Sequence, residues 1–240
     1  MRASLVVVTT FLFLATAKAQ YSGGTGEPED PYLIYTAEQV NAIGAEPNDW
    51  DKHFRLMADI DLAGYAGTDY NIIAPYDADV PFTGVFDGNA HTIANFTYTS
   101  TDANSVALFG WVQGDNAGIM NLGLVDPRIE ASARDGVAPL VDHLEDGTVS
   151  GCFVRGGSVS GGRWVGGLVA YNDGAIINCY SSAAVTGGVS AGGLVGTNGR
   201  SQTIRNSYST GQVGGRAERL EQTLSPDGRY RSEVHRNGHW

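Results

Sequence analysis

The chain has 240 residues, with 15 Lys and Arg against 26 Asp and Glu, which gives a formal net charge of −11 at pH 7. The 33 glycines are about twice the ordinary share, and together with the scarcity of charge they favour a turn-rich all-β protein over a helical one. From Gln20 to Gly215 there are 8 basic and 22 acidic residues, and this acidic body argues against binding of nucleic-acid phosphates.

The first segment of the chain has the pattern of a signal peptide. Met1 and Arg2 form a short positive region, Leu5 to Ala15 an apolar region, and Ala17-Lys18-Ala19 a small-x-small cleavage site. The apolar run is shorter than the roughly 20 residues that a membrane-spanning helix needs. We therefore expect cleavage after residue 19, no membrane span, and a secreted or cell-surface location.

Residues 20–80 are expected to form an N-terminal cap region. Thr36-Ala37-Glu38-Gln39 matches a Thr-x-x-Gln capping box, and the apolar residues that follow it predict one short helix ending at Gly44. Phe54 to Leu62 alternates apolar and polar residues, which predicts a strand leading into the first coil. A helix laid over an open sheet end prevents further strand addition, so capping is its expected role.

Residues 81–214 contain tandem repeats of one template: a strand with Leu and Val after small residues, a Gly or Asn turn, and a second short strand. Four copies begin at Leu108, Leu140, Leu168 and Leu194, which are 32, 28 and 26 residues apart, and a more distant copy begins at Gly84. A unit this short cannot bury an apolar face alone, so it must stack on its neighbours.

Stacked units of this kind predict an all-β fold, a parallel β-solenoid with a short N-terminal capping helix. A β-sandwich also has short strands at regular spacing, but it does not require its strands to resemble one another. In a solenoid Leu140, Leu168 and Leu194 form an interior column. At the turn we predict a ladder of asparagines with left-handed backbone, formed by Asn121, Asn178 and Asn206. Paired glycines before each Leu are expected to mark bends where a side chain would obstruct the turn.

Residues 215–240 do not fit the template. After Gln212-Val213-Gly214 the template requires another Gly-Leu-Val strand, whereas the last 25 residues carry nine charges. We interpret this segment as a non-repetitive tail that is either disordered or the product of a truncated reading frame.

The repeats resemble the GLUG motif of bacterial exported and adhesin-like proteins. The shared pattern is Gly-Gly-Leu-Val-Gly-x-Asn-Gly, then Ile-x-Asn-Ser/Cys-Tyr-Ser and a closing Val. It is clearest in Gly192 to Val213 and in Gly166 to Val185, and looser from Ala107 and Val137. The second copy departs from it, with Pro139 and Gly151 in place of the expected Gly and Asn. The resemblance implies a single-stranded, right-handed parallel β-helix with an extracellular or cell-surface role, and it carries no agreed catalytic residues.

Two cysteines occupy one template position in adjacent repeats. Cys152 and Cys179 are 27 residues apart, and in an oxidising compartment they form either a disulfide or a pair of small stacked core side chains. We favour stacking, because Leu122 and Ser207 occupy the same position in the neighbouring copies. The histidines have no His-Glu-x-x-His spacing, and the chain has no Gly-x-Ser-x-Gly motif, so we predict no catalytic, cofactor-binding or metal-binding residues.

Phe153, Tyr180 and Tyr208 recur at one template position and predict an aromatic column on the wall. An exposed column could contact sugar rings, whereas a buried one packs, and we favour packing. The acidic clusters are interpreted as solvated turns; they are Asp59/Asp61, Asp77/Asp79 and Asp142/Glu145/Asp146.

Two functions are compatible with these features. The prediction is a non-catalytic exported module, structural or adhesive, whose partner is an extracellular glycan or a surface protein. The alternative is a carbohydrate-active enzyme, a lyase or hydrolase of the β-helix class, which should show several acids and a basic residue in one groove. A scaffold should instead show a uniform, acidic, shallow wall. The repeats predict no particular oligomeric state.

Overall fold

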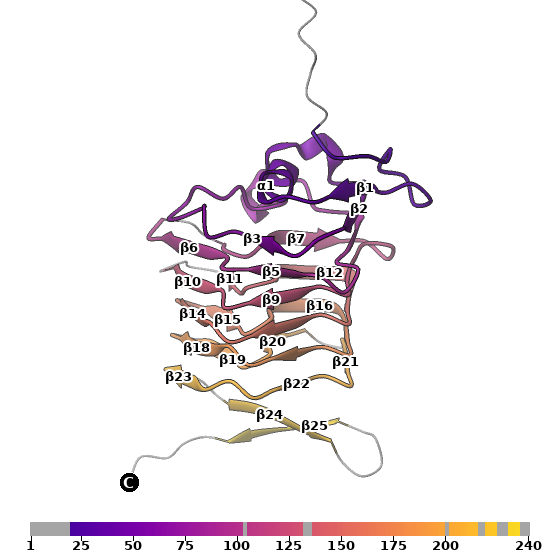
Figure 1. Ribbon diagram of the computed structural model, residues 1–240. Helices are drawn as coiled ribbons and strands as arrows, with labels where there is room; N and C mark the ends of the chain where they lie inside the picture. Colours follow the sequence, from indigo (N-terminus) through magenta and orange to yellow (C-terminus); the bar gives the residue numbers. More distant parts are fainter. Residues whose placement is uncertain are drawn as a thin grey trace, which may run out of the picture.

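The computed structural model describes residues 20–102, 105–131, 136–199, 202–215, 219–224 and 230–235, so the predicted signal peptide lies outside the described residues. The chain winds about six turns around one axis and forms a β-solenoid (Figure 1). Pairing between successive coils is parallel throughout the four walls, as predicted from the repeats.

Each coil contributes strands to the walls of the solenoid. The first wall is a nine-stranded sheet of β1 (Tyr32–Ile34), β2 (His53–Leu56), β4 (Val85–Asp87), β7 (Phe109–Gln113), β8 (Gly118–Met120), β12 (Val141–Ser150), β16 (Val169–Ile177), β20 (Val195–Asn198) and β21 (Thr203–Arg205). The second, six-stranded, consists of β3 (Ile60–Asp61), β5 (Thr92–Ala94), β9 (Gly123–Val125), β13 (Phe153–Arg155), β17 (Tyr180–Ser181) and β22 (Tyr208–Ser209).

Two further sheets complete the coils. The third, five-stranded, is formed by β6 (Thr97–Ser100), β10 (Arg128–Ala131), β14 (Ser158–Gly161), β18 (Ala184–Gly187) and β23 (Val213–Gly215). The fourth, three-stranded, is formed by β11 (Gly136–Val137), β15 (Trp164–Gly166) and β19 (Ser190–Gly192).

The predicted leucine column lies in the interior. The Leu140 N–H donates to the Leu168 carbonyl at 3.2 Å, and the Leu168 N–H donates to the Leu194 carbonyl at 2.9 Å. Leu140 and Leu168 are fully buried, and Leu194 is 9% exposed. The three residues therefore occupy equivalent places in successive parallel coils, which confirms the predicted register.

The interior changes in composition along the axis. Five of its largest fully buried side chains are phenylalanines, all in the N-terminal half: Phe54, Phe82, Phe86, Phe96 and Phe109. In the register of the first wall Phe86 is followed by Ile119, then by Val149 and Ile176. Smaller side chains thus replace the phenylalanines toward the C-terminal coils, over which the spacing of the template Leu falls from 32 to 26 residues.

The asparagine ladder lies at the corner after the first wall. Asn121, Asn178 and Asn206 have positive φ angles of 53°, 56° and 51°, and Gly151, which replaces Asn in the second copy, has 62°. The Asn206 side-chain amide donates to the Asn178 side-chain oxygen at 3.1 Å. Asn and Gly are the residues that adopt this backbone most readily, so the corner selects them.

The paired glycines permit close approach between coils. A Cβ at Gly167 would collide with the Gly193 carbonyl oxygen, and a Cβ at Gly193 would collide with the Ser209 hydroxyl. The bends before Leu168 and Leu194 therefore require a residue without a side chain, whereas Ala107 and Pro139 precede Leu108 and Leu140.

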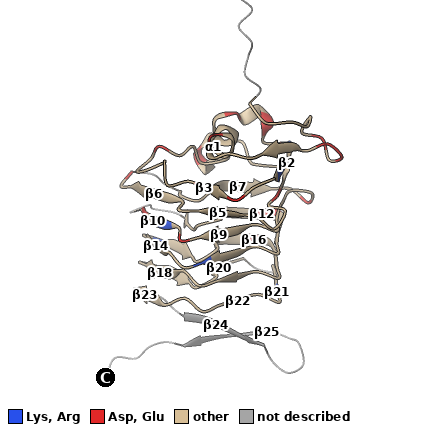
Figure 2. Ribbon diagram, viewed as in Figure 1, with Lys and Arg blue, Asp and Glu red and all other residues tan. Residues whose placement is uncertain are grey.

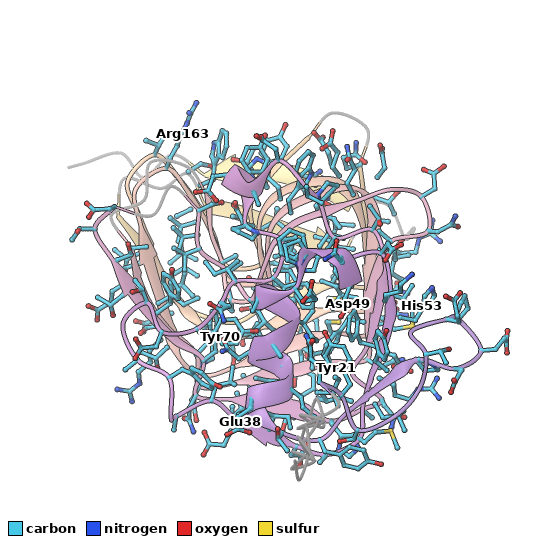
Figure 3. The ribbon with its side chains drawn as sticks, turned by 90° about the horizontal axis from the view of Figure 1, so that it is seen from above. Tyr21, Glu38, Asp49, His53, Tyr70 and Arg163 are labelled. Carbon is cyan, nitrogen blue, oxygen red and sulfur yellow. The ribbon has the colours of Figure 1, made fainter. Side chains whose placement is uncertain are left out.

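The predicted cap helix is α1 (Ala37–Ala45), followed by the short 3₁₀ helices η1 (Pro47–Asp49) and η2 (Tyr76–Ala78). The Gln39 N–H donates to the Thr36 hydroxyl oxygen at 3.3 Å, and the Gln39 side chain accepts from the Tyr35 N–H at 2.8 Å. Val40 and Ile43 on α1 are fully buried. Seen along the axis, α1 lies across the end of the coils (Figure 3), which fits the predicted capping role.

The single strand predicted over Phe54 to Leu62 is wrong. Two strands, β2 and β3, occupy this segment and belong to different sheets, with a corner at residues 57–59 between them. The alternation continues through the corner, because Phe54 and Ile60 both point inward, and so the pattern alone does not reveal the break. β1 and β2 also pair in parallel in the first wall, so the ladder extends into residues 20–80.

The tail contains a different kind of pairing. β24 (Arg219–Leu224) and β25 (Tyr230–His235) form an antiparallel pair beyond the last coil (Figure 1). The pair does not continue the parallel repeat, in keeping with a non-repetitive segment.

We predict that Leu168→Ala lowers the free energy of unfolding by about 2–5 kcal/mol, because it removes buried methyl groups from the middle of the column. Urea denaturation followed by circular dichroism measures the loss. Val189→Ala is the control, since Val189 is 67% exposed, and should change stability by less than about 0.5 kcal/mol. Equal losses in the two variants would contradict the interior position of Leu168.

We further predict that Asn178→Val destabilises the fold more than Asn178→Gly. Both variants lose the amide hydrogen bond from Asn206, which contributes about 1 kcal/mol. Only valine adds the cost of a left-handed backbone, roughly 1–2 kcal/mol. Denaturation midpoints of the two variants measure the difference, and equal midpoints would be inconsistent with a conformational requirement at this corner.

Candidate functional site

The predicted aromatic column exists on the second wall. The Phe153 and Tyr180 rings are stacked with centroids 5.1 Å apart and planes at 3°, and the Tyr180 and Tyr208 rings are stacked at 5.5 Å and 10°. Phe153 and Tyr180 are half-buried, whereas Tyr208 is 55% exposed. The structure therefore brings the three predicted residues together in one file along the axis.

Stacking covers most ring faces in this column. Tyr180 lies between the other two rings, and a Cβ at Gly123 would collide with the Phe153 ring, so Phe153 occupies the space over that glycine. A sugar ring binds to a free aromatic face, and in this column Tyr208, at 55% exposed, has the largest open surface. This geometry supports packing as the main role of Phe153 and Tyr180.

A second aromatic cluster, which we call the His143 patch, lies on the first and fourth walls. It consists of Tyr76, Trp111, His143, Trp164 and Tyr171, from η2, β7, β12, β15 and β16. The imidazole of His143 stacks on Tyr76 at 4.3 Å and on Tyr171 at 5.1 Å. Tyr76 also contacts Trp111 at 5.3 Å, and Trp164 contacts Tyr171 at 5.2 Å. The rings thus form one continuous surface.

Polar groups frame the His143 patch. Asp142 is fully buried, and its carboxylate lies 3.2 Å from Nδ1 of His143. The indole N–H of Trp111 donates to Glu145 at 3.0 Å. Burial raises the pKa of Tyr171, with a further contribution from the neighbouring carboxylate of Asp173. Arg163, at the outer rim in Figure 3, places its guanidinium 4.4 Å from the Trp164 ring centroid.

Sequence reasoning missed this patch, although part of the signal was present. Trp111, His143 and Tyr171 each stand three residues after the template Leu and pair in register, and Thr197 follows them in the next coil. Aligning that position in the repeats would have found three of the five rings. Tyr76 lies outside the repeats, so no template position indicates it.

The two cysteines are stacked core side chains. Both are buried and free, and their thiols donate to backbone carbonyls, Cys152 to Ser150 at 3.4 Å and Cys179 to Ile177 at 3.2 Å. Burial raises the pKa of the Cys152 thiol well above its ordinary value. The favoured stacking arrangement is thus the one that the structure contains.

The acidic pair Asp59 and Asp61 connects neighbouring coils. Asp59 accepts the backbone N–H of Thr92 at 2.8 Å, and Asp61 accepts the side-chain amide of Asn95 at 2.8 Å. These hydrogen bonds lower the pKa of both carboxyls. In Figure 2 acidic residues gather on the cap and its loops, while the coil walls in view carry few charges. Among the described residues no group of three His, Cys, Asp or Glu side chains could hold a metal ion.

In the part of the chain that the structure describes, no helix is both long and apolar enough to cross a membrane. A family model described as the GLUG motif matches residues 161–186, which span β15, β16 and β17 and most of β18. The match confirms the resemblance to the GLUG motif that the repeats indicated.

Two curated proteins are similar in sequence. Halomucin of Haloquadratum walsbyi is 32% identical over 200 residues, which cover 79% of this chain and 2% of halomucin. A protein of Evansella cellulosilytica, provisionally named Gly-rich membrane protein, is 33% identical over 192 residues, which cover 77% of this chain and 22% of that protein. The chain therefore spans a small part of the length of these relatives.

One solved structure has a similar fold. It is a Bacteroides ovatus protein provisionally named immunoglobulin A1 protease, with a TM-score of 0.56 and 21% identity over 91% of this chain and 85% of that one. At this identity the likeness concerns the fold alone.

We predict that neither cysteine reacts with Ellman's reagent in the native protein, because both thiols are buried and the pKa of Cys152 is raised. Two thiols per chain should react after denaturation in guanidinium. Cys179→Ser, which copies Ser207 of the next coil, should fold and expose one thiol on denaturation. Recovery of no thiol from the denatured protein would instead indicate a disulfide.

Proposed function

We propose that the protein is an exported, non-catalytic repeat module that acts at the cell surface or in the extracellular space as a structural and adhesive element. The uninterrupted parallel ladder carries this proposal. Successive coils bond to one another through the main chain, as between Leu140, Leu168 and Leu194, and so the repeats form one rod with continuous outer walls. A rod of this kind provides reach and a large repeated surface.

Two further observations support an extracellular setting. The sequence of residues 1–19 has the pattern of a signal peptide, which would direct export. One of the relatives carries the name of a membrane protein, and both relatives are much longer than this chain. A repeat module that matches one part of a much longer chain suits a structural role.

Four acidic side chains of the described residues have structural partners, which supports a non-catalytic role. Asp59 and Asp61 are engaged in hydrogen bonds to the adjacent coil, as the corner geometry requires. In the His143 patch Asp142 is fully buried behind His143, and Glu145 accepts the hydrogen bond from Trp111. A glycosidase instead needs two carboxyl groups that flank the bond to be cleaved.

The test combines adhesion with product detection. Beads coated with the purified protein are passed over panels of immobilised polysaccharides and extracellular proteins, and soluble reducing sugar is measured in parallel. We expect retention on at least one surface above that of albumin-coated beads, with no release of reducing ends. Release of sugar would replace this proposal by the enzymatic alternative, and absence of retention on every surface would remove the adhesive role.

A further inference from the structure

The His143 patch presents aromatic rings on the outside of the solenoid wall. Strand residues alternate between the two faces of a sheet, and Val112, Leu144 and Asn172, which follow Trp111, His143 and Tyr171 in the chain, are fully buried. The three rings therefore stand on the outer face. Tyr76, which packs on them from the η2 segment, is itself 43% exposed.

The solenoid does not need aromatic rings at this position. In the next coil Thr197 occupies the place of Tyr171, and β20 still pairs with β16 in the same register. Large aromatic side chains gathered on the surface of a soluble protein mark interaction sites more often than structural ones. Ligand binding therefore explains the rings of the His143 patch better than a role in folding does.

The chemistry of the patch favours one class of ligand. Sugars bind to proteins through C–H faces laid on aromatic rings and through hydroxyl groups that donate to carboxylates. Glu145 and Asp173 provide such carboxylates, since they are register partners two residues beyond His143 and Tyr171 and share their outer face. The net charge of −11 repels acidic polysaccharides and nucleic acids, so a neutral sugar is the better fit.

We infer that the His143 patch is the binding site for a neutral polysaccharide, with the rings as the platform and Glu145 and Asp173 as acceptors of sugar hydroxyls. This inference rests on the adhesive role proposed above and assigns it to one face of the molecule. It is separate from the column of Phe153, Tyr180 and Tyr208, which lies on the second wall.

Affinity electrophoresis in native gels tests the inference. The gels contain β-glucan, mannan, xylan or galactan as neutral probes and polygalacturonate as the acidic one. We expect at least one neutral polymer to retard the protein and polygalacturonate to leave it unaffected.

Tyr171→Thr, which copies Thr197, should raise the dissociation constant at least about tenfold, equivalent to about 1.4 kcal/mol. Tyr180→Thr, a matched change on the second wall, should leave it within about twofold.

A second variant tests whether misfolding, rather than loss of a contact, explains weaker binding. Tyr76→Ala changes a residue outside the wall strands, and it should weaken binding in the same direction while the circular dichroism spectrum and Tm stay those of the wild type. Binding should also alter the tryptophan fluorescence, since Trp111 and Trp164 lie in the patch. Unchanged fluorescence on binding would place the sugar elsewhere.

The outcomes separate this inference from the proposed function. If the wild type binds a neutral polysaccharide and both patch variants keep its affinity, the site assignment is wrong and the adhesive role stands. If beads adhere to a protein surface while no polysaccharide retards the chain, the sugar class is wrong. If choline inhibits adhesion of the coated beads while no polysaccharide binds, the rings hold a quaternary ammonium group instead. Absence of any adhesion would remove the proposed function itself.

Discussion

The structure depends on main-chain hydrogen bonding between parallel strands of successive coils, whose register is interrupted on the first wall by a shift between Glu145 and Thr148. The bond from Leu168 to the carbonyl of Leu194 is one member of this series, and the same register continues around all four walls. Because each residue lies directly above its counterpart in the next coil, like residues stack into columns. The leucine column, the asparagine ladder, the cysteine pair and the aromatic column all follow from that single constraint.

The same register explains where charges are absent. Neighbouring strands are about 4.8 Å apart, so a charge repeated in every coil would lie beside its own kind. Between β2 and β4 the register partners Arg55 and Asp87 carry opposite charges and form an ion pair at 3.2 Å. Glu145 and Asp173 of the His143 patch are register partners of like charge. Acidic side chains elsewhere stand mainly on the cap and at corners, where hydrogen bonds from Thr92 and Asn95 engage Asp59 and Asp61.

Repetition decides how much of the molecule could be predicted from sequence. Leu168 and Asn178 were placed correctly because each recurs once per coil, and recurrence identifies a column without knowledge of the coil's shape. The corner between Phe54 and Ile60 was missed, because inward-facing residues alternate through it without interruption. Tyr76 joins the His143 patch from a segment with no counterpart in the repeats, so only three-dimensional proximity reveals its contact with His143.

The shortening repeat has a mechanical consequence for a rod that is pulled by its two ends. Strands run across the axis, so force applied along the chain loads the last coil first and peels it away before the next one yields. Each detached coil of the size that separates Leu168 from Leu194 would lengthen the chain by about 90 Å when fully extended. Energy is thereby dissipated in discrete steps, and those steps become longer toward the phenylalanine-rich end, where each winding holds more residues.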